Sequence, residues 1–340
     1  MQNDKKIGNL FYYWLITSFT LIFIMIIVGG LTRLTNSGLS ITEWELFSGI
    51  LPPTSSDSWN KYFSLYKNIP QFYLLNNSMT LNEFKIIFFW EYAHRMLGRI
   101  IGLFFIIPLV YFYFNNKINK KYLFSCCIIL FLIIFQGVVG WYMVKSGLVN
   151  NVTVSHYRLS LHLTIALIII SLLFWNILNY GTYRNEIDKK NKNIIYFYYL
   201  LFFLILLQVV LGAFVSGLDA GRIYQTWPLM NLSYFPDELN INYFTDFFNF
   251  DSHALVQFYH RNLAYLISCI IFFYGLYIFK KNIFKLKKPF YLIFSILLIQ
   301  IFLGVTTLLS GLNIYLASAH QICSVLLLLS AINLYFCHIK

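Results

Sequence analysis

Four histidines lie at similar depths in four apolar segments of the chain, and they form two matching pairs. The pairs are His94 with His162 and His260 with His320. An imidazole ring is costly inside a bilayer unless a partner satisfies it, and a metal ion does so while using the ring as a ligand. Two histidines from facing helices supply the axial ligands of a haem iron. The pattern therefore predicts two haem sites, one for each pair.

An internal repeat relates the two pairs. The segment WEYAHRMLGRIIG (90–102) aligns with QFYHRNLAYLIS (257–268), which superposes His94 on His260. A second alignment superposes Gln136, Gly140, Ser146-Gly147-Leu148 and His162 on Gln300, Gly304, Ser310-Gly311-Leu312 and His320. A lone histidine in a membrane most often makes a hydrogen bond between helices, but four that are related by a repeat favour iron ligation. The unpaired histidines are expected to be solvated or interfacial: His156, His253 and His338.

Long apolar segments must position these residues, because the chain is 59% hydrophobic and only 11% charged. Runs of about 20 apolar residues are typical of membrane-spanning helices. Eight such runs occur, at 9–30, 85–111, 121–143, 155–178, 194–217, 255–279, 287–309 and 313–336. The sequence therefore predicts an all-α integral membrane protein with eight transmembrane helices.

Four spans per half is an even number, so the two halves of the repeat should have the same orientation. We expect two pseudo-symmetric four-helix bundles, a parallel repeat, at 1–180 and 194–340. All four paired histidines then lie near the outer ends of their helices. The N-terminal bundle contains His94 and His162, and the C-terminal bundle contains His260 and His320.

The chain has a net charge of +12, and most of its basic residues lie in the segments expected on the inner side of the membrane. These basic residues are Lys5, Lys6, Lys117, Lys120, Lys121, Arg184, Lys189, Lys190, Lys192, Lys280, Lys281, Lys285, Lys287, Lys288 and Lys340. The positive-inside rule then places both termini in the cytoplasm. The excess charge is explained by topology, so no nucleic-acid partner is needed. The residues before the first span are too few for a transit peptide, which favours a bacterial inner membrane.

Two long loops, 31–84 and 218–254, are expected on the outer side, and both are rich in aromatic residues. Loops of this length often cover a functional site, but aromatic loops also serve as anchors in the membrane interface. The sequence leaves both roles open. All five cysteines fall in or at the ends of the spans, and no CxxCH motif is present. Packing is therefore their expected role, a covalently attached c-type haem is not expected, and a disulfide in the outer loops is excluded.

Glu91 distinguishes the two halves. It precedes His94 by three residues, so it lies on the same helical face, one turn toward the outer side. Its counterpart in the repeat is the neutral Gln257. A carboxylate inside a membrane is costly and indicates function, and the alternative is an interfacial carboxylate that pairs with Arg95 or Arg99. Glu-x-x-His also occurs in di-iron carboxylate sites, but Gln257 removes the second copy that such a site requires.

This asymmetry predicts one reactive site and one electron-transfer site. Several arginines gather at the outer helix ends: Arg33, Arg95, Arg99, Arg158, Arg222 and Arg261. Guanidinium groups suit the propionates of haem, and snorkelling to the interface is the competing explanation. Glycines in the spans, such as Gly140 and Gly304, permit either close helix packing or room for a flat macrocycle.

The chain resembles the haem A synthase family, in its alphaproteobacterial and mitochondrial form. The matching motifs are GGLTRLTNSGLSITEW (29–44), PP (52–53), EFKIIFFWEYAHRMLGRIIG (83–102), GWYMVKSGL (140–148), YRLSLHL (157–163), QVVLGAFVSGLDAGRIYQTWPLM (208–230), YHRNLAYL (259–266) and LASAHQ (316–321). They follow in order through nearly the whole chain. The other bacterial branch of the family has a cysteine pair in its first outer loop, and this chain has none there.

The resemblance implies that haem O is oxidised at a porphyrin methyl group to a formyl group, giving haem A for cytochrome oxidase. It also implies that His260 and His320 hold a haem b, and that His94 and His162 mark the site of the substrate haem. A glutamate at the position of Glu91 is implied to be important for turnover. A haem O synthase, cytochrome oxidase assembly and an unidentified electron partner are the implied neighbours.

Two other function classes fit paired histidines in a membrane. A cytochrome b that exchanges electrons with quinone would hold two permanent, equivalent haems and would not need Glu91. A haem transporter or chaperone would release its haem chemically unchanged. The haems extracted from membranes distinguish all three classes.

Overall fold

Eight long apolar helices dominate the computed structural model, which describes residues 2–43, 48–148, 152–180, 192–239 and 243–340. Each is long and apolar enough to cross a membrane, and each overlaps one of the predicted runs. The helices are α1 (Gln2–Leu34), α4 (Leu81–Phe114), α5 (Lys120–Gly147), α6 (His156–Asn179), α7 (Lys192–Gly217), α8 (His253–Lys280), α9 (Phe284–Leu309) and α10 (Ile314–Ile339). The predicted all-α fold with eight spans is confirmed, and the chain is a multi-pass membrane protein.

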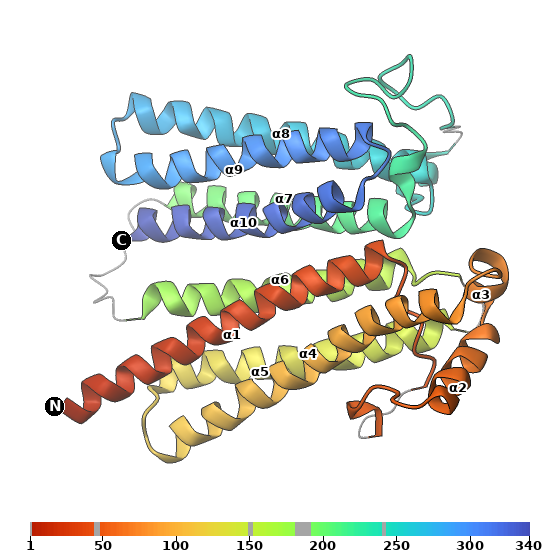
Figure 1. Cartoon of the computed structure of the whole chain (residues 1–340). Coiled ribbons are helices and arrows are strands. Elements are labelled where there is room, and N and C mark those ends of the chain that lie inside the picture. The colour runs from red at the N-terminus through yellow and green to blue at the C-terminus, as the bar shows by residue number, and fades with distance from the viewer. Residues whose placement is uncertain (1, 44–47, 149–151, 181–191, 240–242) are drawn as a thin grey trace. The chain divides into compact units, whose positions relative to one another are not determined.

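The chain divides into two compact units, Met1–Ile177 and Leu178–Lys340. In the first unit α1 packs against α4, and α4 also packs against α5. In the second unit α7 packs against α8, α8 against α9, and α9 against α10, while α10 returns to α7 (Figure 1). The pseudo-symmetry between the two predicted bundles stays a prediction.

Polar caps define where α4 and α8, two of the helices that carry the histidines, begin. At the start of α4, Thr80 Oγ1 accepts a hydrogen bond from the Glu83 amide, and Glu83 Oε2 accepts one from the Thr80 amide, a capping box. Ser252 caps the start of α8 by accepting from the Leu255 amide. The chain leaves α4 and α8 through asparagines in the left-handed region, Asn116 and Asn282, each with φ of 52°.

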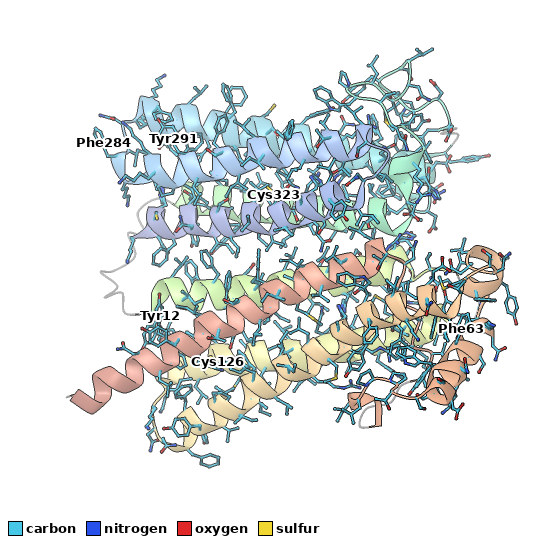
Figure 2. All side chains as sticks on the ribbon, viewed as in Figure 1. Tyr12, Phe63, Cys126, Phe284, Tyr291 and Cys323 are labelled. Carbon is cyan, nitrogen blue, oxygen red and sulfur yellow. The ribbon has the colours of Figure 1, made fainter. Side chains whose placement is uncertain are left out.

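The loop between α1 and α4 folds onto the start of α4. It contains η1 (Ser48–Ile50), α2 (Ser56–Lys67) and α3 (Pro70–Leu75). Trp59, Phe63 and Tyr66 of α2 are buried in a cluster with Phe84 and Phe88 of α4 (Figure 2). Burial raises the pKa of Tyr66, whose neutral hydroxyl donates to Gln71 Oε1 at 3.0 Å. This apolar cluster holds the loop over one end of the bundle.

The loop between α7 and α8 contains less helical structure than the loop between α1 and α4. It contains η2 (Ala220–Arg222) and η3 (Phe244–Phe248). Tyr224 and Met230 are buried against Ala254 at the start of α8. Large apolar side chains nevertheless remain exposed along this loop, among them Leu232 (94%) and Phe244 (77%). The loop therefore combines a packed base with an apolar exposed surface.

All five cysteines are free, and the predicted packing role fits the buried Cys126 and Cys323, whereas Cys127 and Cys269 are exposed. Cys126 in α5 and Cys323 in α10 are buried among apolar side chains (Figure 2). The predicted orientation rests partly on Lys5, Lys6, Arg184, Lys189, Lys190 and Lys192, whose side chains lie outside the described part of the chain. The cytoplasmic placement of the termini thus stays a prediction.

Candidate functional site

The structure brings each predicted histidine pair together. His94 of α4 faces His162 of α6, and His260 of α8 faces His320 of α10. The ring centroids are 6.4 Å apart in both pairs. A metal–imidazole nitrogen distance of about 2.0–2.1 Å, plus about 1.1 Å from nitrogen to centroid, places iron-bridged rings about 6.2–6.4 Å apart. Both pairs therefore have the spacing that one iron between two imidazoles requires.

Each of the four rings rests against a glycine of a neighbouring helix. A Cβ built on Gly29, Gly140, Gly212 or Gly304 would lie 2.9, 3.2, 3.1 or 2.8 Å from Cε1 of His94, His162, His260 or His320, respectively. Any larger residue would displace the ring. These four glycines therefore make room for the histidine ring that faces them. Gly102 and Gly137, in contrast, have no atom within 4 Å of the added Cβ.

Glutamines four residues before three of these glycines contact the histidine helices. Gln136 Nε2 donates to the His162 carbonyl oxygen at 2.8 Å, and Gln208 Nε2 donates to the His260 carbonyl oxygen at 3.0 Å. Gln300 Nε2 lies 3.4 Å from His320 Nε2. Sequence reasoning gave these glutamines no role. The spacing Gln-x-x-x-Gly, which occurs in α5, α7 and α9, is the signal that marks them.

The two units differ in how the rings are held. His260 Nδ1 lies 3.2 Å from Gln208 Nε2, and His320 Nδ1 lies 3.1 Å from the Gln300 carbonyl oxygen. The Nδ1 atoms of His94 and His162 are buried without a hydrogen-bond partner. A metal-bound histidine usually donates its second ring N–H to an acceptor that fixes the ring. Of the four rings, only that of His320 has such an acceptor at Nδ1, the Gln300 carbonyl oxygen, because Gln208 Nε2 is itself a donor.

Glu91 is buried, with 3% of its surface exposed, and both of its carboxylate oxygens are engaged. Arg95 donates to Oε1 through Nη2 at 2.6 Å and Nε at 3.1 Å. The Ser40 hydroxyl and the Ile41 amide each donate to Oε2 at 2.8 Å. The pairing with Arg95 that the sequence offered as an alternative is therefore present, in a buried rather than an interfacial setting. Glu91 ties α4 to the loop that follows α1.

Arg95 completes this clamp by binding the same loop. It donates to the carbonyl oxygens of Ile41 at 2.8 Å and of Glu43 at 3.2 Å. These contacts and the ion pair occupy the guanidinium of Arg95. Arg95 therefore holds the loop to α4, a role that differs from the propionate contact indicated by the sequence.

The second unit has the same clamp without the carboxylate. Arg261 donates to the carbonyl oxygens of Tyr224 at 2.9 Å and of Thr226 at 2.9 Å, which have the same two-residue spacing as Ile41 and Glu43. Gln257 Nε2 also donates to the Tyr224 carbonyl oxygen at 2.9 Å. The repeat thus extends to the loops, and the difference between Glu91 and Gln257 is one of charge within a shared clamp.

Of the remaining predictions on titratable residues, one is confirmed and one is wrong. His253 is exposed, as predicted, but His156 is buried at the start of α6, so the prediction of a solvated or interfacial ring is wrong there. The residue begins a packed helix and its ring turns inward. Among the residues that the structure describes, no group of three or more His, Cys, Asp or Glu side chains could hold a metal ion. The di-iron reading therefore has no ligand set in that part of the chain.

Comparisons with known proteins show the family of the chain. Residues 12–332 match the COX15-CtaA family, described as cytochrome oxidase assembly protein. A protein named heme A synthase from Pelagibacter ubique is 49% identical over 323 residues, covering 93% of each chain. Proteins of the same name from Rickettsia bellii and Orientia tsutsugamushi are 44% and 40% identical, covering 93% and 96% of this chain and 94% and 95% of their own length.

Proposed function

Because the chain belongs to the COX15-CtaA family and functions as an enzyme of haem A synthesis, we propose that it oxidises a porphyrin methyl group of haem O to a formyl group. The substrate haem is held by His94 and His162 in the first unit. A resident haem b is held by His260 and His320 in the second unit. The observation that carries this proposal is the equal 6.4 Å spacing of the two pairs.

The difference in ring anchoring supports the assignment of the two sites. A resident haem benefits from a ligand of fixed orientation, and of the four rings only that of His320 has an acceptor at Nδ1, the Gln300 carbonyl oxygen. A substrate haem must enter and leave in every turnover, which suits the unanchored rings of His94 and His162. A hydrogen bond to the second ring nitrogen of a metal-bound histidine commonly changes metal affinity by about 10–100-fold, which is large enough to separate a resident haem from an exchanging one.

The conversion of a methyl to a formyl group requires two successive two-electron oxidations, first to an alcohol and then to a hydrated aldehyde that loses water. When the electrons leave through the resident haem, each round takes up one water molecule and releases two electrons and two protons. The resident haem supplies the capacity to accept and pass on electrons one at a time. The protein contributes orientation through the paired histidines and exclusion of water through the apolar helices around them. The product is haem A, and the chain acts in cytochrome oxidase assembly.

Glu91 is the acidic residue nearest in sequence to the substrate ligand His94. We assign it the role of accepting protons from the reacting carbon or of stabilising positive charge that develops there. Its support is the contrast with Gln257, which makes the loop contact of the second unit without a charge. A clamp alone does not require a carboxylate, so the charge of Glu91 has another purpose.

The same proposal includes the membrane location and the partners of the protein. The chain resides in a bacterial inner membrane with both termini in the cytoplasm. A haem O synthase supplies its substrate, cytochrome oxidase receives its product, and a separate electron partner reoxidises the resident haem.

The test is expression of the chain in membranes that contain haem O but no other source of haem A, followed by chromatography and mass spectrometry of the extracted haems. Appearance of the formyl product supports the proposal. Recovery of unmodified haem O bound to the purified chain would favour a carrier.

A further inference from the structure

Ser40 is a buried serine of the loop after α1, and it lies against the carboxylate of Glu91. The residue is only 1% exposed. Its hydroxyl oxygen is 2.8 Å from Glu91 Oε2 and 3.3 Å from the carbonyl oxygen of Ile87, which lies one turn earlier on α4. The hydroxyl proton therefore has two acceptors within reach, one charged and one neutral.

Four hydrogen bonds converge on the Glu91 carboxylate in the described part of the chain. Arg95 donates two, and the Ile41 amide and the Ser40 hydroxyl donate one each. An ionised carboxylate has about four lone-pair sites, so these donors fill it, and a proton can bind only after one of them withdraws. The guanidinium and the amide have no acceptor capacity, so neither can receive a hydrogen bond from a protonated carboxyl group.

Ser40 alone among these partners can reverse its role. A hydroxyl group has one donor and two acceptor lone pairs, and its hydrogen rotates to suit its surroundings. When Glu91 carries a proton at Oε2, Ser40 Oγ can accept the hydrogen bond from it and turn its own hydroxyl toward the Ile87 carbonyl oxygen. The carboxyl group then holds one more proton, and the contacts of Arg95 and Ile41 stay in place.

The second unit lacks this hydroxyl. The shared spacing of the loop carbonyl groups aligns Ile41 with Tyr224, which places Ile223 at the position of Ser40. Ile223 has no hydroxyl, and the side chain that contacts Tyr224 is the neutral Gln257. Gln257 Oε1 is buried without a hydrogen-bond partner among the described residues. The serine hydroxyl therefore accompanies the carboxylate, and a clamp between helix and loop forms without it.

We propose that Ser40 is a positioning residue for the proton acceptor: it lets Glu91 take up a proton and release it while the clamp stays closed. The inference rests on the proposed function and deepens it, because it assigns proton uptake to Glu91 rather than charge stabilisation alone. In each oxidation round Glu91 takes one of the two released protons at Oε2 and returns it to water, while both electrons leave through the resident haem. Without the Ser40 hydroxyl, none of the groups that contact Glu91 could accept that proton.

A double-mutant cycle tests this role. Ser40→Ala, Glu91→Gln and the double variant of the full chain are expressed in membranes that contain haem O, and each is purified. Chromatography and mass spectrometry measure the haem A formed and the haem O bound. Haem A output is expressed per chain with bound haem O, so a loss of turnover is separated from a loss of binding.

Ser40→Ala is expected to lower haem A output by about 10–100-fold, the range that corresponds to one hydrogen bond to a charged group. The alcohol should accumulate, as in Glu91→Gln, while bound haem O and haem b stay near the wild-type level. In the Glu91→Gln chain the same substitution is expected to change output by less than about twofold, because residue 91 then accepts no proton. A purely structural serine would lower output or bound haem O there too, because the glutamine carbonyl still accepts its hydrogen bond.

Ser37→Ala is the matched control. Ser37 is a serine of the same loop with 0% exposure, and its hydroxyl contacts Thr35 Oγ1 rather than Glu91. This variant is expected to keep haem A output near the wild-type level. Ser40→Cys keeps the side-chain shape but replaces the hydroxyl with a thiol, a weak donor and acceptor. It should also lower output, and it supplies the comparison if Ser40→Ala does not retain its haems.

The outcomes separate the inference from the proposed function. Near-normal output from Ser40→Ala, with Glu91→Gln impaired, would overturn the inference and leave the proposed function intact. An equal loss in Ser37→Ala, or a further loss when Ser40→Ala is added to Glu91→Gln, would assign Ser40 to loop packing and also overturn the inference. Absence of the formyl product from the wild-type chain would contradict the proposed function itself.

Discussion

Replacement of Glu91 by glutamine separates its charge from its place in the clamp. The glutamine carbonyl can still accept from Ser40 and Ile41, but its amide group faces the two Arg95 donors. Two charge-assisted hydrogen bonds are lost, at about 1.5–3 kcal/mol each, or about 3–6 kcal/mol in the buried pair. Arg95 keeps the carbonyl oxygens of Ile41 and Glu43. We expect the fold and the binding of substrate haem to survive, because Arg261 is held by carbonyl oxygens beside a neutral Gln257.

Haem A output should nevertheless fall by about 10²–10³-fold, the usual effect of removing one proton-transfer or electrostatic group. The partly oxidised alcohol should accumulate. The assay is extraction of haems from membranes with matched protein and haem content, followed by chromatography and mass spectrometry. Near-normal conversion by Glu91→Gln would remove the charge of Glu91 from the mechanism and leave it as a partner of Arg95. Loss of output together with loss of bound substrate haem would assign Glu91 to the clamp alone.

Gln257→Glu is the reciprocal control. It places a carboxylate beside Arg261 in the second unit, where the resident haem is held. This variant should keep both haem b and haem A output, because the second unit holds a permanent haem that is not the substrate.

Two further substitutions test packing and topology. Gly304→Ala should reduce bound haem b, because its Cβ would lie 2.8 Å from His320 Cε1. Gly137→Ala is the control and should leave the absorption spectrum unchanged, because open space surrounds its Cβ. Equal spectra for the two variants would refute the packing argument. Single cysteines at Ser56 and Leu232, in a chain without the five native cysteines, should react with an impermeant maleimide in intact spheroplasts, and labelling only after lysis would reverse the topology.

Hydropathy and the internal repeat predicted the eight spans and both histidine pairs, since these features depend on residues within one segment or on its aligned copy. The sequence also offered Arg95 or Arg99 as a partner for Glu91. It did not predict that both bind the loop around Ile41, because that contact joins residues 50 or more positions apart in the chain. Loop geometry of this kind is not encoded in periodicity.

The glutamines illustrate a second limit. The alignment contained Gln136 and Gln300, but a polar residue in an apolar helix has many possible partners, so its role required coordinates. The burial of His156 was missed for a related reason, since a position at a helix end is exposed or buried according to what packs over it. A search for glutamines four residues before the glycines would have found Gln208 as well.

The most direct test of the two-site account is the haem content and absorption of four purified alanine variants. His260→Ala and His320→Ala should lose the b-type spectrum, because each removes one axial ligand of the resident haem. His94→Ala and His162→Ala should keep that spectrum and form no haem A. The account is contradicted if the variants at 94 and 162 lose haem b while the variants at 260 and 320 retain it.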